Sequence, residues 1–386
     1  MRSLLILFAV VVQFGQRPPL SPAETLLEPA VLRAINEAPT SAAAVAVIQG
    51  SDSAAGEVVL SCRPGLCDTA TQAAQKLQSL VVAAKLAQPS RTIRIVSAID
   101  PDTARRTKAA IHVGQTEPRG LQIVRGPWST AGIADEVVEI FSRQGSHAVE
   151  VRPFENIGQL GWDAYGVPVT TIVTSTALSK QHAASVAAAA AYFLATLPNA
   201  GAEALLSHLT VGAHERLAQD GRKAVAQMGN QQRAGADVLI MFTHAIEREQ
   251  RRMRSFERFM PAPVDPMLRS RLADMEKGIT SVWTSMGITS SPFVPAAERI
   301  RGRGGEDRRV PLRFRDGPLP APDPPTAMLK YPNVADVIYE LGNFIDGKRS
   351  ISDIRDAVSA EFGPVALPVV VDYFERLAKT GAVSIR

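Results

Sequence analysis

The chain has 386 residues, of which 46% are hydrophobic and 21% are charged, and its formal net charge is +4. This composition is typical of a globular protein with room for two or three domains, and it excludes an intrinsically disordered chain. The charge is also too small to indicate a nucleic-acid-binding protein, because such a protein gathers positive charge to offset the phosphates.

The first 20 residues predict a secretory signal peptide. Arg2 precedes nine apolar residues, 4–12, which match the hydrophobic region of a signal peptide and are too few to cross a bilayer. No Ala-x-Ala cleavage site follows, so an uncleaved anchor or a short buried strand is the alternative. The leader predicts a periplasmic or extracellular location. No later stretch is long and apolar enough to predict a transmembrane span.

Residues 21–200 predict a domain of the α/β class. Strands and helices alternate there at a spacing typical of a layered domain with a mostly parallel sheet. The expected strands are 43–48, 57–62, 91–98, 109–113, 121–124, 149–152 and 167–173, and the expected helices are 22–37, 68–86, 133–143 and 180–197.

Cys62 and Cys67 are the two cysteines of the chain, with Pro64 and Gly65 between them. Their separation allows a disulfide in an oxidising compartment, and a pair of free thiols is the alternative. A zinc site built on this pair is not expected, because no second cysteine pair or nearby histidine completes a tetrahedral ligand set.

Residues 201–290 predict a helical extension. One long helix is expected over residues 238–259, and it carries a dense run of charges at 247–254. We expect this run to form a solvated helix face, with pairs four residues apart such as Glu247–Arg251. Residues 291–328 are rich in Pro, Gly and Arg and predict a linker.

Residues 329–386 predict a small winged-helix-like module. Three helices (334–344, 350–362 and 368–380) and a terminal strand (381–385) are expected. Winged-helix modules often bind DNA, but this one carries seven basic residues against eight acidic residues. A negative balance does not suit phosphate binding, so no nucleic acid is expected and the module is predicted to dock a protein or to cap the fold.

Three segments resemble bacterial zinc-dependent exopeptidases of the aminopeptidase type. They are residues 91–94, the alanine-rich run 187–196 and, most specifically, residues 339–358. The resemblance spans roughly residues 45–386 and implies an exopeptidase-like α/β domain, a helical extension and a small C-terminal module. It also implies two zinc ions, held by two histidines and three carboxylates, which bind a bridging water and the free amino end of a peptide.

The resemblance also assigns roles to individual residues. Asp68 stands where the bridging metal ligand is expected, Asp100 where a carboxylate base is expected, and His112 where a further metal ligand is expected. Residues 61–63 replace the histidine expected after the preceding strand, and the expected Tyr-His-Thr segment is absent from residues 174–180. In a parallel sheet, ligands bind beyond the carboxyl ends of the strands, where these residues are expected to lie.

At most three of five ligands therefore remain, and this loss is expected to weaken zinc binding strongly. We expect a catalytically degenerate zinc aminopeptidase-like protein that holds no cofactor and acts by binding peptides or a protein partner. The alternative is an active zinc aminopeptidase that hydrolyses N-terminal residues of peptides, with an atypical site of Asp68, Asp100 and either His112 or His182. Ordinary structural roles are also open: a helix N-cap for Asp68, a turn for Asp100 and a satisfied sheet residue for His112.

Overall fold

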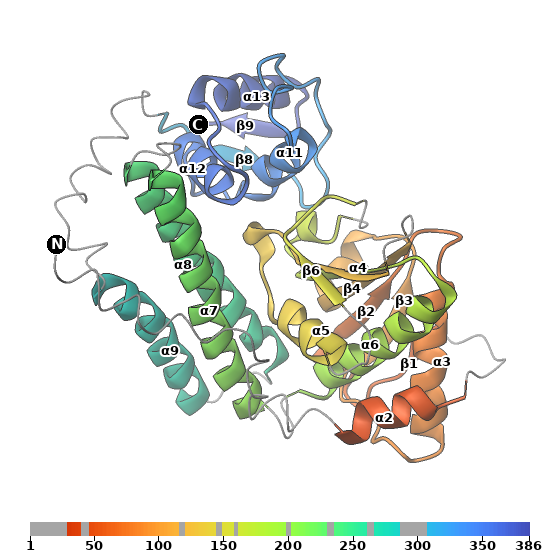
Figure 1. The fold of residues 1–386 in the computed structure, drawn as a ribbon. Coiled ribbons are helices and arrows are strands. Elements are labelled where there is room, and N and C mark those ends of the chain that lie inside the picture. The colour runs from red at the N-terminus through yellow and green to blue at the C-terminus, as the bar shows by residue number, and fades with distance from the viewer. Residues whose placement is uncertain are drawn as a thin grey trace.

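The computed structural model describes residues 29–39, 46–115, 120–143, 149–157, 161–197, 202–229, 235–260, 266–285 and 307–386. Within these ranges we distinguish an α/β unit (29–197), a helical unit (202–285) and a C-terminal unit (307–386), which are seen together in Figure 1. The predicted signal peptide lies outside the described residues, and so do residues 286–306, which include most of the first half of the predicted linker.

A seven-stranded sheet organises the α/β unit, with the strand order β1-β3-β2-β4-β7-β5-β6. Strands β3, β2, β4 and β7 run parallel to one another, as do β5 and β6, whereas β1 and β5 run antiparallel to β3 and β7. The mostly parallel α/β architecture is thus confirmed. The strands are β1 (Val47–Ile48), β2 (Glu57–Ser61), β3 (Thr92–Val96), β4 (Thr107–Gln115), β5 (Leu121–Val124), β6 (Val149–Arg152) and β7 (Val169–Thr174).

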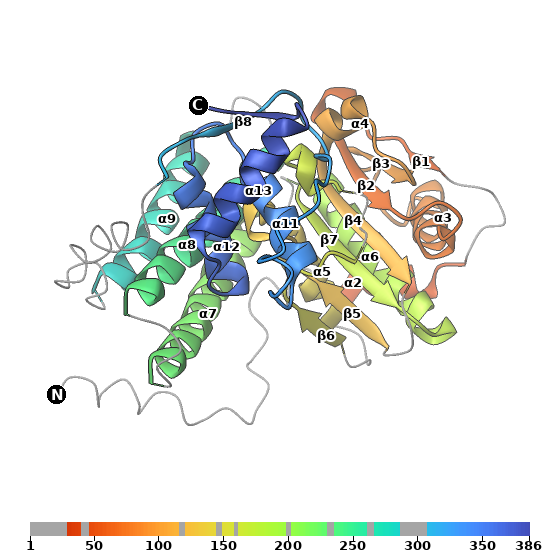
Figure 2. The ribbon, with the colours of Figure 1, turned by 90° about the horizontal axis from the view of Figure 1, so that it is seen from above.

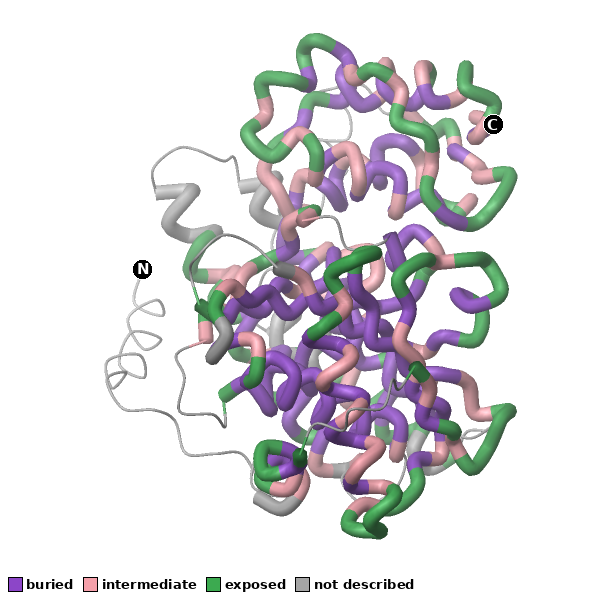
Figure 3. The backbone as a smooth tube through the Cα atoms, turned by 90° about the vertical axis from the view of Figure 1, so that its right-hand side faces the viewer, coloured by how far each residue is buried: buried purple, intermediate pink, exposed green. Residues whose placement is uncertain are grey.

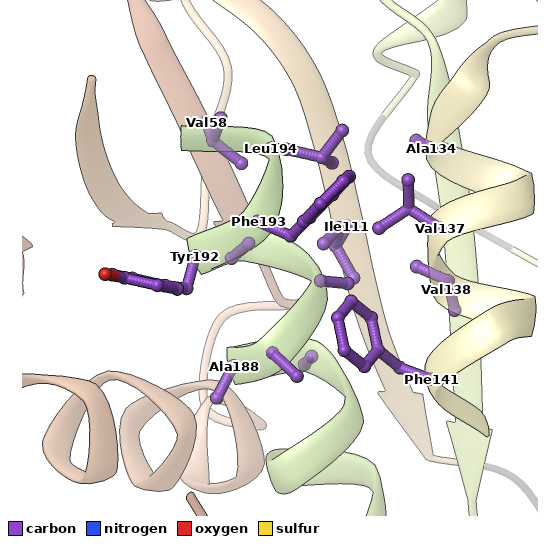
Figure 4. Close-up of a cluster of buried hydrophobic side chains, with 14 of the residues drawn as sticks. Val58, Ile111, Ala134, Val137, Val138, Phe141, Ala188, Tyr192, Phe193 and Leu194 are labelled. Carbon is purple, nitrogen blue, oxygen red and sulfur yellow. The ribbon is translucent and has the colours of Figure 1, made fainter. Parts of the chain in front are cut away.

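Four helices cover the first face of the sheet. Successive side chains of a strand point to opposite faces, so Leu60 and Ile111 lie on this face, within the main hydrophobic core. Figure 4 shows Phe141 and Phe193 from two of these helices meeting edge to face, with ring centroids 6.2 Å apart. The helices are α2 (Pro29–Glu37), α3 (Asp68–Val82), α5 (Ile133–Arg143) and α6 (Ala177–Thr196).

Helix α6 is the central helix of this layer. Residues 183–191 include seven alanines, and all of these alanines are fully buried. Because alanine side chains are small, α6 can approach the sheet closely while it also contacts α2, α3 and α5. A helix that is apolar on nearly every side is expected to be buried, and the prediction for residues 180–197 is confirmed.

The second face of the sheet has a smaller cover. Val59 and Ala110 lie there and pack against Trp162 and against Ala104 of α4 (Pro101–Arg106). The short 3-10 helix η3 (Asp163–Tyr165) follows Trp162 and also contacts α4. This face carries the polar residues described below.

The helical unit consists of α7 (Ala202–Gly229), α8 (Gly235–Arg254), the 3-10 helix η4 (Ser255–Phe259) and α9 (Pro266–Ser285). The expectation that residues 247–254 form a solvated face is wrong. Arg248, Glu249 and Arg252 are at most 6% exposed, because α8 packs against α7 and the α/β unit. The expected Glu247–Arg251 ion pair is present, with 3.1 Å between the charged groups.

The C-terminal unit contains the three predicted helices and the predicted terminal strand. They are α11 (Val334–Asn343), α12 (Ile351–Phe362), α13 (Leu367–Lys379) and β9 (Val383–Ile385). A further strand, β8 (Pro311–Arg313), pairs antiparallel with β9, although it lies in the range interpreted as a linker. The winged-helix assignment stays a prediction. In Figure 2, α12 of this unit lies beside α8 of the helical unit.

Each unit has a buried interior, as the purple segments of Figure 3 show. Within the described ranges, no single helix is long and apolar enough to cross a membrane. Helices α12 and α13 meet the length and composition criteria only as a pair, and they are bent by 116° at their junction. Ile354 of α12 and Phe374 of α13 are fully buried in the core of the C-terminal unit.

Candidate functional site

Ser61 and His112 form the polar centre of the second face of the sheet. They are register partners on the neighbouring strands β2 and β4, so their side chains lie side by side. Ser61 Oγ is 2.9 Å from His112 Nδ1, and the Trp162 indole N–H donates to the same Ser61 oxygen over 2.9 Å. The three residues are at most 1% exposed, so the hydrogen-bonded group is enclosed by the protein.

The His112 imidazole is neutral over the physiological range. Burial, with a smaller contribution from the positive charge of Arg63, lowers its pKa to about 4. A neutral imidazole can bind a metal, but this ring lies in the interior and uses Nδ1 to contact Ser61. One of the two ring nitrogens thus has a partner, which favours the structural alternative of a sheet histidine.

Asp100 caps the start of α4. Its Oδ1 accepts hydrogen bonds from the backbone N–H groups of Asp102 (3.0 Å) and Thr103 (2.8 Å), and its Oδ2 accepts from the Thr103 hydroxyl (2.6 Å). The Thr103 hydroxyl and the two backbone donors lower the pKa of Asp100. Both oxygens therefore have structural partners, and the assignment of Asp100 as a general base stays a prediction. The sequence indicated a turn here and missed the short helix.

Asp68 is the first residue of α3 and is exposed. The N-cap position belongs to Cys67, so Asp68 is not itself the cap. Its negative charge at the first turn interacts favourably with the helix dipole.

Cys62 and Cys67 form a disulfide with 5.2 Å between their Cα atoms, which settles the choice between a disulfide and free thiols. The bond ties the end of β2 to the start of α3.

The predicted ligands do not form a metal site in the part of the chain that the structure describes. No group of three or more His, Cys, Asp or Glu side chains is arranged there to hold a metal ion. His182 belongs to α6 on the first face, whereas His112 points to the second face, so the sheet separates the two imidazoles. The donors present therefore do not fit the zinc ions that the family resemblance implies.

A second polar group, which the sequence did not predict, lies where the C-terminal unit meets the α/β unit. The Tyr339 hydroxyl of α11 donates to Asp163 Oδ1 over 2.6 Å. Beside it, Glu340 accepts hydrogen bonds from the backbone N–H (3.2 Å) and the hydroxyl (2.8 Å) of Ser129. Asp163 and Glu340 are at most 2% exposed. Burial raises the pKa of Asp163 to about 7 and also raises the pKa of Glu340.

A sequence signal for this group did exist. Glu340 lies three residues from Val337 and four from Phe344, both buried, so it shares the apolar stripe of α11. An acidic residue on such a stripe indicates a buried polar contact. Asp163 likewise stands between Trp162 and Tyr165 in a segment with few other charges.

Comparisons with known proteins leave the chain without a family. No family model matches it, and no curated protein matches it significantly. Among solved structures, a candidate peptidase from Clostridium acetobutylicum is similar over 88% of this chain, with 12% identity and a TM-score of 0.25. This chain spans 59% of that chain. Similarity at this level is distant and assigns neither a fold nor an activity.

Proposed function

We propose that the protein is a catalytically degenerate zinc aminopeptidase-like protein that acts by binding peptides or a protein partner. The observation that carries the proposal is the position of His112, which is enclosed with Ser61 and Trp162 on the second face of the sheet. Peptides are proposed as ligands because of the sequence resemblance, which gives the class of substrate.

The contacts of the predicted site residues support a binding role over hydrolysis. A zinc ligand needs a free donor atom that converges with other donors at tetrahedral distances. His112 would have to leave its buried position beside Ser61, and Asp100 would have to give up three hydrogen bonds that begin α4. Asp68 and Asp100 are both exposed, but the Asp100 oxygens are engaged in those three hydrogen bonds, and the one further carboxylate of Asp68 binds zinc weakly.

Metal analysis and a substrate panel test this proposal directly. The purified full-length chain would be incubated with zinc, dialysed, and assayed for bound metal and for hydrolysis of chromogenic aminoacyl substrates. Fluorescent peptide libraries would then be tested for binding by anisotropy. We expect substoichiometric zinc, no hydrolysis, and saturable binding of a subset of peptides.

The variants Asp68→Ala and Asp102→Ala form a matched pair, because both residues are exposed acids in the first turn of a helix. Stoichiometric zinc with turnover that Asp68→Ala abolishes and Asp102→Ala retains would establish the alternative, an active aminopeptidase with an atypical site. Absence of both turnover and peptide binding would reject peptides as ligands and leave a protein partner to be sought.

A further inference from the structure

We propose that the contact between Asp163 and Tyr339 is a pH-sensitive switch, which holds α11 on the α/β unit while the Asp163 carboxyl is protonated and loosens when it ionises. The contact joins two units of the molecule. Asp163 lies on η3, beside the cover of the second sheet face, and Tyr339 lies on α11 of the C-terminal unit.

The surroundings of Asp163 favour its neutral form. The residue is 2% exposed, and its Oδ1 accepts the Tyr339 hydroxyl, while its Oδ2 is buried without a hydrogen-bond partner among the described residues. A neutral carboxyl tolerates such a position much better than a carboxylate, because a buried charge needs several donors or a cation to replace its hydration.

The groups of α11 do not supply that compensation. Tyr339 gives a single neutral hydrogen bond, and the neighbouring Glu340 adds a carboxyl whose charge would repel a carboxylate at Asp163. Phe154, from the segment after β6, stacks on the Tyr339 ring with centroids 5.9 Å apart and makes the surroundings of that ring more apolar. The α11 side of the contact is therefore apolar or acidic.

The cations of the other surrounding segments bind groups other than the Asp163 carboxyl, although the buried Nε of Arg313 has no hydrogen-bond partner among the described residues. On α4, which packs against η3, Arg105 pairs with the exposed Asp102 over 2.6 Å. Near β8, Arg313 donates to the carbonyl oxygens of Ala164 (3.1 Å) and Gly317 (3.0 Å). Two further arginines also have other partners: Arg106 pairs with Glu57 over 3.3 Å, and Arg258 donates to the Gly166 carbonyl oxygen over 2.8 Å.

The switch operates near neutral pH. Burial, helped by the charge of Glu340, raises the pKa of Asp163 from 3.8 to about 7, against the opposing effects of the Tyr339 hydrogen bond and of the backbone N–H groups of Asp163 and Ala164. A raised pKa means that the contribution to docking is complete below about pH 4 and is lost as the pH rises through about 7. If release of α11 returned Asp163 fully to water, this separation of about three pH units would correspond to a docking equilibrium that weakens about a thousandfold.

Loosening of α11 would uncover a defined part of the molecule. Trp162 immediately precedes Asp163 and donates to Ser61, which in turn contacts His112. Meanwhile α12 packs along α8, so the C-terminal unit stays attached to the helical unit when α11 moves. The switch would therefore control access to the second face of the sheet without releasing the C-terminal unit.

Hydrogen exchange of the full chain between pH 5 and 9, corrected for intrinsic exchange rates, tests the proposal at residues 334–343. In the wild type we expect exchange of α11 to increase with a midpoint near pH 7, while α3 stays protected. Asp163→Asn keeps an acceptor for Tyr339 and stays neutral, so its α11 should show no pH step. Tyr339→Phe removes a hydrogen bond that lowers the pKa of Asp163, so its midpoint should move upward.

Asp102→Asn, which neutralises an exposed carboxyl on the adjacent helix α4, is the matched control and should keep the wild-type profile. A pH step that persists in Asp163→Asn, or an α11 that stays protected in the wild type up to pH 9, would overturn the proposal. A midpoint that does not move in Tyr339→Phe would also contradict it.

Discussion

Ser61 connects two side chains, those of His112 and Trp162, that lie far apart in the sequence. One hydroxyl accepts from the Trp162 indole and contacts His112 Nδ1, so a residue of β2 fixes both a loop 101 positions away and a ring on β4. Such a group stabilises the fold because buried polar atoms must find partners inside the protein. The group also explains why the candidate ligand His112 is held away from the surface.

We expect Ser61→Ala to lower the free energy of unfolding by about 2–4 kcal/mol, because the Trp162 N–H and the His112 Nδ1 would both lose a buried partner. Urea unfolding at pH 7 gives the value. Ser97→Ala, at an exposed position after β3, is the control and should change stability by less than about 0.5 kcal/mol. Equal effects of the two substitutions would show that the buried hydroxyl is not a structural centre.

The helices α5, α7 and α8 are joined by buried ions instead of by apolar contacts alone. Arg216 of α7 donates to Glu249 of α8 over 2.8 Å and pairs with Glu136 of α5, while Arg252 of α8 contacts Asp135 of α5 over 3.1 Å. These side chains are at most 8% exposed. Because buried ions are costly when unpaired, the group fixes how the helical unit sits on the α/β unit.

Replacement of Arg216 by Met should destabilise the protein by about 3–5 kcal/mol, because Glu136 and Glu249 would keep their buried charges without their shared cation. Thermal and urea unfolding provide the measurement. Arg105→Met removes the exposed partner of Asp102, and its expected effect is below about 1 kcal/mol. A similar loss of unfolding free energy in both variants would mean that a buried ion pair contributes no more to stability than an exposed one.

Acid should weaken the same group. Burial alone would raise the pKa of Glu249, but the charges of Arg216, Arg252 and Arg248 hold it well below its usual value of 4.5. A depressed pKa contributes stability above about pH 4.5 and loses it as the pH falls further. We expect the slope of unfolding free energy against pH below 4.5 to be shallower in Glu249→Gln than in the wild type. An unchanged slope would assign acid lability to other carboxyls.

At the scale of the whole molecule, the sequence predicted the α/β class, and its strands and helices agree closely with the structure at 121–124, 133–143 and 149–152. Alternating and helical patterns report which face of an element is buried, and this signal is local. The strand order could not be predicted from the sequence, because no local pattern indicates that β7 lies between β4 and β5. The short elements α4 and β8 were missed since six and three residues show too little periodicity.

The candidate site was less predictable than the fold. The sequence identified Asp68, Asp100 and His112 by their places at strand ends and helix starts, but it could not show which partners their atoms would find. The turn expected at Asp100 is instead the N-cap of α4, the cap expected at Asp68 falls on Cys67, and one nitrogen of the His112 ring has a partner, Ser61. The contact of Asp163 with Tyr339 joins residues 176 positions apart, so it depends on how the units pack.

A comparison of two fragments tests where the C-terminal unit begins. The fragment 307–386 includes β8, whereas the fragment 329–386 lacks it. Without β8, the backbone groups of β9 that pair with it lose their partners, and the buried Val383 becomes exposed. We expect the longer fragment to show cooperative melting by circular dichroism and dispersed NMR signals, and the shorter fragment to lose both. Indistinguishable melting of the two fragments would support the boundary at 329 that the sequence predicts.

The central place of β7 in the sheet has a consequence for synthesis of the chain. Its neighbours β4 and β5 leave the ribosome earlier and can pair with β2 and β6, yet neither can pair along its second edge until residues 169–174 have emerged. During that interval β4 and β5 each present a strand edge with unpaired backbone groups, which is where nascent chains associate wrongly. Translation pauses or chaperone binding would therefore matter most while residues 125–174 are being made, and substitutions that slow the arrival of β7 would reduce the yield of folded protein more than its stability.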